Sequence, residues 1–159
     1  MRKLLWYAKD RTLYLLLVSK MKFDKQLIGY ITALESSTSA RVKDCFLRDG
    51  TLVYIVYTGD LGKALGKSGL NIRKLSFRLG HRLRIIEFNE DPCIFVRNLF
   101  YPLTGFDVNS RDNIIAISTQ DRILLGKLYG RSKATLKEAN EILKRHFKDL
   151  EIVVDGSVV

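Results

Sequence analysis

The sequence is poor in the residues that metal and redox chemistry need. It holds two cysteines and two histidines among 159 residues. Cys45 and Cys93 lack the paired spacing and the nearby histidines of a zinc site or a redox motif. We therefore expect both thiols to be reduced and to lie in the core of a cytoplasmic protein. We expect no metal and no cofactor.

Motifs of enzymes and of membrane spans are also missing. His81 and His146 have no partnered carboxylate or cysteine, and neither G-x-S-x-G nor H-E-x-x-H occurs. No apolar run reaches the length of about 20 residues that crosses a bilayer. Lys9, Asp10 and Arg11 interrupt the apolar opening segment. These absences favour a protein that is not an enzyme and does not span a membrane.

Residues 1–21 are basic and apolar without a clean period, and Met21 offers an alternative start. We interpret them as an N-terminal extension that is unordered or that precedes the native start. A basic arm that touches RNA or a membrane is the alternative.

Charge of one sign is in excess. The chain has 27 Lys and Arg against 17 Asp and Glu, a formal net charge of +10. Such an excess favours a polyanionic partner, nucleic acid above all. The alternative is a soluble protein that is merely basic.

From residue 22 onward the chain shows regular elements. Leu27, Ile31 and Leu34 recur at helical spacing. Two β-branched and aromatic runs follow, joined by Asp49-Gly50, a pair that tolerates the positive φ of a tight hairpin. Two helices on either side of the sequence GKSG and one alternating strand come next. The predicted order is helix, strand, strand, helix, helix, strand.

The same order returns from Asp91, which we expect to cap a helix with Pro92 at its first position. A shift of 64 places LGKALGKSGLNIRKL (61–75) on LGKLYGRSKATLKEA (125–139) with five identities: Leu61/Leu125, Gly62/Gly126, Lys63/Lys127, Gly66/Gly130 and Ser68/Ser132. The chain is therefore predicted to be an α+β sandwich built from one domain twice. We expect domains at 22–90 and 91–155, and a tail at 156–159.

The stretch GDLGKALGKSG (59–69) has the look of a nucleotide-binding loop. That loop requires G-x-x-x-x-G-K-[ST], so that backbone N–H groups surround the phosphates. With Gly66, Lys67 and Ser68 as its end, the first glycine belongs at position 61, where the chain has Leu61. No strand downstream ends in an aspartate placed for magnesium. We expect no ATP or GTP binding.

The other interpretation of GKSG is a G-x-x-G turn between two helices, which offers free N–H groups to a backbone phosphate. Here the sequence resembles the KH family of single-stranded nucleic-acid binders. Its I-G-x-x-G-x-x-I core matches Leu65, Gly66, Gly69 and Ile72, and the helix-first order resembles the type II variant. The second copy has Lys133 where the family usually has the second glycine. We therefore expect the second turn to bind RNA more weakly or to have a different shape.

The segment 22–154 is similar to the short archaeal form of the transcription factor NusA. The similarity rests on ALESSTSARVKDC, LGKSGLNIRKL, EFNEDPCIFVRNLF and ANEILKRHF. It implies two closely packed type II KH domains that form one continuous RNA surface. It also implies a role in transcription elongation or termination beside RNA polymerase.

The RNA-binding residues expected from these patterns surround the two turns. Basic side chains supply charge, apolar ones edge a groove for unstacked bases, and one tyrosine offers a stacking surface. In the first copy they are Lys63, Leu65, Gly66, Lys67, Ser68, Gly69, Ile72, Arg73 and Lys74. In the second copy they are Lys127, Tyr129, Gly130, Arg131, Ser132, Lys133 and Lys137. Solvated helix faces are the alternative for the outer cations.

We therefore predict a monomeric, non-enzymatic protein of the archaeal NusA type that binds single-stranded RNA and works with RNA polymerase. A ribosomal or ribosome-assembly KH protein is one alternative. A degenerate KH scaffold that binds protein is another, and the intact first turn argues against it.

Overall fold

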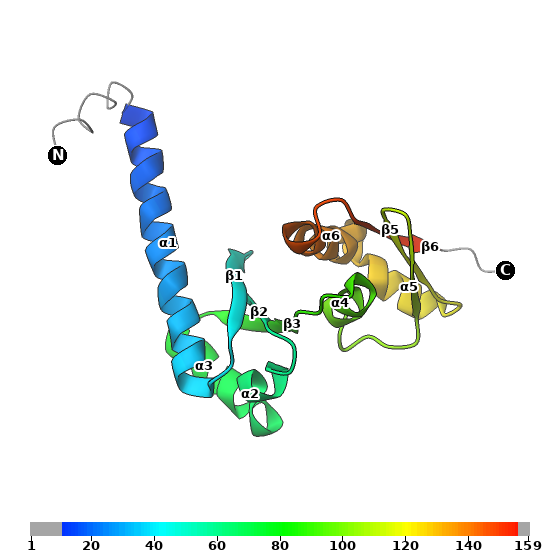
Figure 1. The fold of residues 1–159 in the computed structure, drawn as a ribbon, viewed down its shortest axis with the longest axis horizontal. Coiled ribbons are helices and arrows are strands. Elements are labelled where there is room, and N and C mark those ends of the chain that lie inside the picture. Colours follow the sequence, from blue (N-terminus) through cyan, green and yellow to red (C-terminus); the bar gives the residue numbers. More distant parts are fainter. Residues whose placement is uncertain (1–10, 156–159) are drawn as a thin grey trace. The chain divides into compact units, whose positions relative to one another are not determined.

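The computed structural model describes the chain from Arg11 to Asp155, with side chains from Lys25 onward. The chain divides into two compact units that meet between Ile85 and Ile86. Both units have the order helix, strand, strand, helix, helix, strand (Figure 1). This order confirms the predicted fold class, α+β with two tandem KH-like domains of type II. The boundary predicted after residue 90 lies beyond the division between the units.

The first unit is a three-stranded sheet with helices. Its strands lie in the order β1, β2, β3. The elements are α1 (Arg11–Thr38), β1 (Val42–Arg48), β2 (Thr51–Val56), α2 (Leu61–Leu65), η1 (Lys67–Gly69), α3 (Leu70–Leu79) and β3 (Arg82–Glu87).

Helix α1 is longer than the sequence suggested. Its expected start lay near residue 22, whereas it begins at Arg11 and takes in residues 11–21 of the supposed extension. The added segment, RTLYLLLVSKM, has four Leu, one each of Arg, Lys and Met, and no Gly or Pro, a composition that favours a helix. The part of the supposed extension before Arg11 lies outside the described residues.

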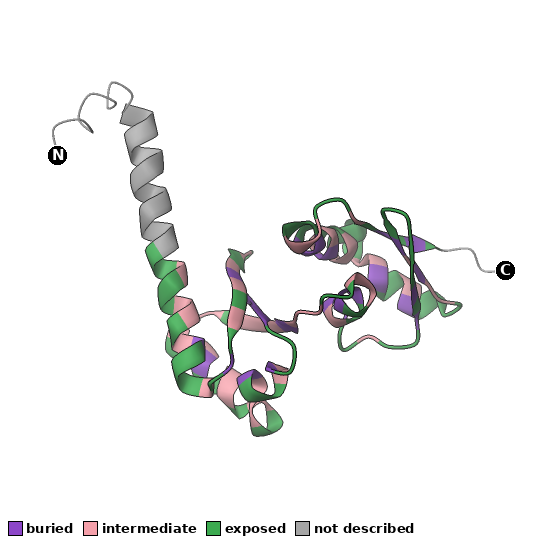
Figure 2. Ribbon diagram, viewed as in Figure 1, coloured by how far each residue is buried: buried purple, intermediate pink, exposed green. Residues whose placement is uncertain are grey.

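The predicted hairpin of the first unit is confirmed. Strands β1 and β2 run antiparallel with Arg48 opposite Thr51, and the two residues between them are Asp49 (φ 47°) and Gly50 (φ 75°). Two consecutive positive φ values match the right-handed twist of the strands that they join. Strand β2 is buried from Leu52 to Val56 and appears purple in Figure 2.

The core of the first unit lies between helices and sheet. Leu34 of α1, Leu75 of α3, and Leu52 and Tyr54 of β2 are buried together. The Tyr54 hydroxyl donates a 2.9 Å hydrogen bond to the Tyr30 carbonyl, so its polar end is satisfied. Burial raises the pKa of Tyr54 far above its ordinary value.

The second unit has the same architecture. Strands β4 and β5 are antiparallel, and β6 runs parallel to β5. Asp91 accepts a 2.8 Å hydrogen bond from the Cys93 N–H and Pro92 is the first helical residue, as predicted. The elements are α4 (Pro92–Leu99), β4 (Asp107–Arg111), β5 (Ile114–Ser118), α5 (Arg122–Tyr129), η2 (Arg131–Lys133), α6 (Ala134–His146) and β6 (Glu151–Asp155).

Helix α6 and strand β6 are joined by one amide side chain. Asn140 donates from Nδ2 to the Ile152 carbonyl at 3.0 Å and accepts from the Ile152 N–H at 2.7 Å. Ile152 itself is buried, as are Ile142 and Leu143 of α6. This two-way bond fixes the last strand against the helix that follows the second turn.

The sequence predicted that both cysteines lie in the core and that the chain does not span a membrane. Cys45 is buried, and Cys93 is only partly buried. Between Arg11 and Asp155, no helix is both long enough and apolar enough to cross a membrane.

Candidate nucleic-acid interface

The two turns, residues 66–69 and 130–133, have one backbone shape. Gly66 (φ 69°, ψ 175°) matches Gly130 (φ 68°, ψ 174°), and Ser68 and Ser132 both have φ 53°. Gly69 (φ 72°, ψ 21°) is matched by Lys133 (φ 62°, ψ 23°). The second turn is therefore not differently shaped in its backbone, because Lys133 accepts the left-handed conformation that Gly69 has.

The local geometry requires glycine only at the first position of each turn. Gly66 and Gly130 lie in a region of φ and ψ that is essentially restricted to glycine. A Cβ on Gly66 would lie 2.5 Å from Cγ of Asn71, and one on Gly130 would lie 2.8 Å from the Thr135 backbone nitrogen. A Cβ on Gly69 would meet only Ile72 Cγ2, at an ordinary 3.6 Å.

Both turns present backbone donors that the described residues leave unused. Gly69 N–H bonds to Gly66 and the Leu70 N–H to Lys67, whereas the Lys67 and Ser68 N–H groups meet no acceptor in the described part of the chain. In the second turn, the Arg131 and Ser132 N–H groups likewise meet no acceptor among the described residues. Two adjacent N–H groups before a helix form an anion-binding site.

The first turn is held by two side chains from α3. Asn71 Nδ2 donates to the Lys63 carbonyl at 3.0 Å, which satisfies a backbone acceptor at the end of α2. Arg73 donates from Nη2 to the Ser68 carbonyl at 2.5 Å. Arg73 was expected to contact RNA, and the structure places its guanidinium on the turn itself. Sequence reasoning missed Asn71, although the matched position, Thr135, is polar too.

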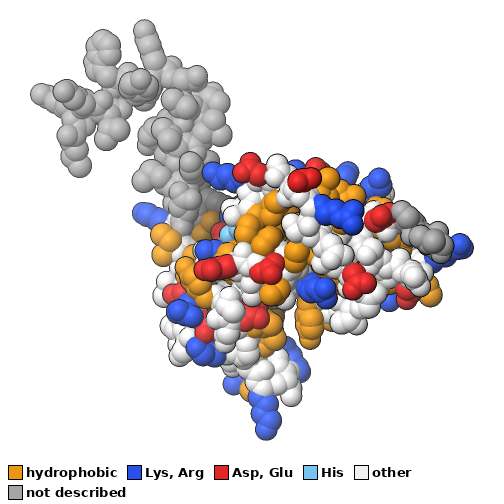
Figure 3. Space-filling model, turned by 45° about the vertical axis from the view of Figure 1, so that its right-hand side comes forward, with side chains coloured by type: hydrophobic (Ala, Val, Ile, Leu, Met, Phe, Trp, Pro, Cys, Tyr) orange, Lys and Arg blue, Asp and Glu red, His pale blue; other side chains and the backbone are white. Residues whose placement is uncertain are grey.

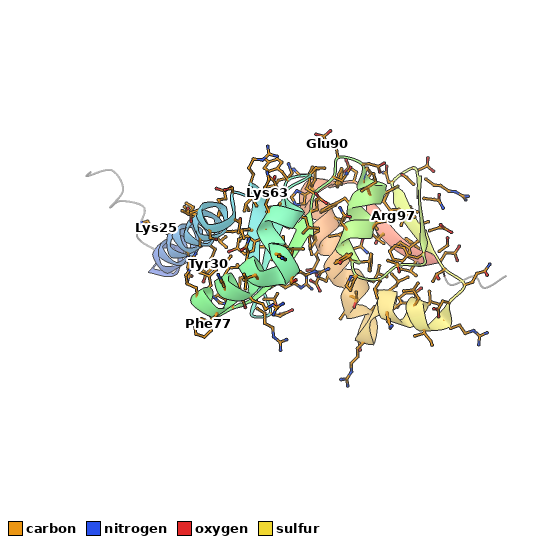
Figure 4. The ribbon with its side chains drawn as sticks, turned by 90° about the horizontal axis from the view of Figure 1, so that it is seen from below. Lys25, Tyr30, Lys63, Phe77, Glu90 and Arg97 are labelled. Carbon is orange, nitrogen blue, oxygen red and sulfur yellow. The ribbon has the colours of Figure 1, made fainter. Side chains whose placement is uncertain are left out.

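Lys63, another predicted contact, is paired within the first unit. It lies on α2 (Figure 4), and its Nζ is 2.6 Å from Oδ1 of Asp60. Asp60 is buried and also accepts from the backbone N–H and Nε of Arg41, at 3.0 and 2.8 Å. The Lys63 ammonium and the Arg41 groups hold the pKa of the Asp60 carboxyl well below its usual range.

Tyr129 is anchored in the second unit. Its hydroxyl donates to the Val154 carbonyl at 2.9 Å, and the Lys133 ammonium lies 5.8 Å from the centre of its ring. The ring is partly buried, so only part of it remains for stacking. Lys133 thus lies over the residue that was predicted to hold a base.

The remaining predicted residues divide by exposure. Those that are half-buried are Leu65, Gly66, Gly69, Ile72 and Gly130. Those that are exposed are Lys67, Ser68, Lys74, Lys127, Arg131, Ser132, Lys133 and Lys137. Of these exposed cations, Lys67, Arg131 and Lys133 lie in the turns themselves, and Lys74, Lys127 and Lys137 lie on the helices that flank them.

Charge elsewhere is mixed. On the face that Figure 3 shows, Lys and Arg side chains are interspersed with Asp and Glu side chains. Each turn differs from this mixed surface in having exposed cations beside unused backbone donors, an arrangement that attracts an anion.

No protein-family model matches the chain. Individual relatives do match. A protein of Methanocaldococcus jannaschii named "Probable transcription termination protein NusA" is 30% identical over 141 residues, which cover 86% of this chain and 76% of that protein. A protein of the same name from Halococcus morrhuae is 28% identical over 79% of this chain and 93% of its own length. A third, from Methanococcus vannielii, is 34% identical over 56% of this chain.

A solved structure titled "Crystal structure of APE1850" has the same fold. Its TM-score is 0.66 at 24% sequence identity, and the match covers 82% of this chain and 98% of that one. The relatives' shared name is that of a transcription factor and not of an enzyme. The chain therefore belongs to the archaeal NusA family and is a NusA-like transcription factor.

Proposed function

We propose that this protein binds single-stranded RNA through both of its turns and acts on nascent transcripts in elongation or termination, beside RNA polymerase in the cytoplasm. The observation that carries the proposal is the pair of unused N–H groups in each turn, with Lys67 or Arg131 beside them. Such a pair fits one phosphate of a strand that approaches closely, since Gly66 and Gly130 carry no side chain to obstruct it.

A single strand is favoured over a duplex by the scale of the site. Each turn offers donors for about one phosphate, and next to the first turn lie half-buried apolar side chains, Leu65 and Ile72. Unstacked bases can lie on such apolar surface, whereas the bases of a duplex are hidden in its stack. RNA binding through two such turns requires no catalytic group, in keeping with a factor that is not an enzyme.

The test uses one pair of substitutions in each turn. The first-turn variant combines Lys67→Asp and Ser68→Asp. The second-turn variant combines Arg131→Asp and Ser132→Asp. Ser68 and Ser132 both have φ 53°, and aspartate tolerates that region, so backbone strain is matched. The control pairs Lys144→Asp with Ser110→Asp, two exposed positions outside the turns that receive the same change of charge.

Affinity for a fluorescent single-stranded RNA would be measured by anisotropy at one salt concentration, with folding checked by circular dichroism. We expect both turn variants to bind more weakly than the control, and the first-turn variant to lose more. Lys133 adds a Cβ and a mobile charge where Gly69 has neither, and an exposed ion pair is worth under about 1 kcal/mol. Turn variants that bind RNA as well as the control does would overturn the proposal.

The alternatives predict different partners. A ribosome-assembly protein would sediment with ribosomal particles from cell extract, and a protein-binding scaffold would not crosslink to RNA at all. A transcription factor should instead crosslink to many nascent transcripts and change the termination efficiency of purified archaeal RNA polymerase in vitro.

A further inference from the structure

A second basic and aromatic cluster lies in the first unit, where Tyr57 precedes α2 and the turn follows it. Tyr57 keeps 40% of its surface exposed. The Arg41 Cζ atom lies 5.3 Å from the centre of the Tyr57 ring, and Lys43 Nζ lies 5.4 Å from it. We call these three residues the Tyr57 cluster. None of them was singled out by the sequence.

The sheet brings the three residues together. The Tyr57 N–H donates to the Arg41 carbonyl at 3.1 Å, which extends the pairing of β1 with β2 by one step. The register of the two strands then shifts between Val42 and Asp44, so Lys43 lies at a bulge. Bulges re-aim side chains and are common next to functional sites. Both cations consequently reach one ring.

Asp60 fixes Arg41 in place. Its carboxylate accepts from Arg41 Nε at 2.8 Å, while the Arg41 side chain remains 67% exposed. The same carboxylate holds Lys63 on α2, the helix that ends at the first turn. A buried acid therefore orders two exposed cations, Arg41 beside the Tyr57 ring and Lys63 on the helix that leads to the turn.

We propose that the Tyr57 cluster is a second contact for single-stranded RNA, with one base stacked on the Tyr57 ring and a neighbouring phosphate facing Arg41 and Lys43. The proposal rests on the proposed function and extends it beyond the turns. A flat ring beside fixed cations matches a nucleotide, which joins a flat base to an anion.

The matching place in the second unit has the opposite chemistry. There, where β4 begins and β5 ends, a hollow is lined by Gly105, Asp107, Ser118, Thr119, Gln120 and Asp121. This lining has no cation and no aromatic ring, and its carboxylates repel phosphate. The added contact therefore belongs to the first unit alone. It makes the first copy the stronger RNA site even though the two turns share one backbone shape.

The experiment is photo-crosslinking of the full chain to a single-stranded RNA of about 12 nucleotides that contains 4-thiouridine, a length within the range for such sites. Mass spectrometry then locates the crosslinked residues. We expect crosslinks at Tyr57 as well as at the first turn, and none at residues 118–121. Tyr57→Ser should weaken binding about 5- to 150-fold, the range for loss of one stacked base. Tyr57→Phe should retain most of the affinity.

The matched control is Tyr101→Ser, which removes a tyrosine that is 70% exposed in the other unit, and should bind as the wild type does. If Tyr57→Ser fails to fold, Lys43→Gln against Lys25→Gln tests the same cluster by charge. Crosslinks at the turns with none at Tyr57, or unchanged affinity in the Tyr57 and Lys43 variants, would overturn this inference and leave the proposed function standing. Absence of RNA binding altogether would overturn both.

Discussion

The two glycines of the first turn should differ in how much stability they contribute, because Gly66 lies in a region of φ and ψ nearly restricted to glycine, whereas Gly69 is left-handed, a region that other residues enter at a smaller cost. Gly66→Ala forces alanine into a region of φ and ψ that costs about 1–3 kcal/mol. The new Cβ would also lie 2.5 Å from Cγ of Asn71. That side chain can rotate away, but it then loses its 3.0 Å hydrogen bond to the Lys63 carbonyl, worth about 1 kcal/mol.

Together these costs predict that Gly66→Ala lowers the free energy of unfolding by about 2–4 kcal/mol. Gly69→Ala should cost less, about 1–2 kcal/mol, the ordinary cost of the left-handed region. Its Cβ meets no close atom, and Lys133 already has this conformation in the second turn. Gly62→Ala is the control, since Gly62 lies in α2 with open space around it and alanine is the better helix residue by about 0.5–1 kcal/mol.

Urea unfolding followed by circular dichroism measures all three variants. The double variant Gly66→Ala/Asn71→Ala should lose less unfolding free energy than the sum of the losses in the two single variants, because Gly66→Ala alone already breaks the Asn71 hydrogen bond. If Gly69→Ala destabilised the protein as much as Gly66→Ala, the assignment of the conformational requirement to Gly66 would be wrong. If Gly66→Ala and Asn71→Ala were additive, the predicted loss of the Asn71 hydrogen bond would be wrong.

Three further predictions follow from other features. The pKa of Asp60 is lowered in the folded state, so its ion pairs stabilise the fold above about pH 4, the ordinary aspartate pKa, and that stabilisation is lost as the pH falls below it. Asp60→Asn should therefore flatten the decline in the urea midpoint between neutral and acid pH. An unchanged slope would contradict this. Affinity for single-stranded RNA should fall with salt by about 0.7 log units per phosphate contact for each log unit of salt, and a flat response, or tighter duplex binding, would contradict the turn model. Calorimetry with ATP and magnesium should show no saturable binding, because Leu61 begins a helix where a nucleotide loop needs a glycine.

Much of the fold could be predicted from the sequence, because the residues that specify each turn and helix start lie close together in the chain. Asp49-Gly50 specifies a hairpin by the φ values that the pair tolerates, and Asp91 with Pro92 specifies a helix start by donors and acceptors within three residues. The repeat at a spacing of 64 identified two copies of one unit and matched the two turns to each other. The requirement for Gly66 and Gly130 is local as well, since it arises from the backbone of the turn.

The tertiary structure decided which polar groups are available to a ligand. Arg41 and Asp60 are 19 residues apart in the chain, and only the sheet brings them into contact. That contact orders Arg41 beside the Tyr57 ring. The pairing of Asp60 with Lys63, by contrast, is local, because the two residues are three apart in the chain. Arg73 reaches the Ser68 carbonyl across only five residues, from the helix that directly follows the turn. Sequence gives the charge of each residue, but its partner depends on the path of the whole chain. The sequence therefore determined where the turns lie, and the fold determined which cations beside them are already engaged and which face solvent.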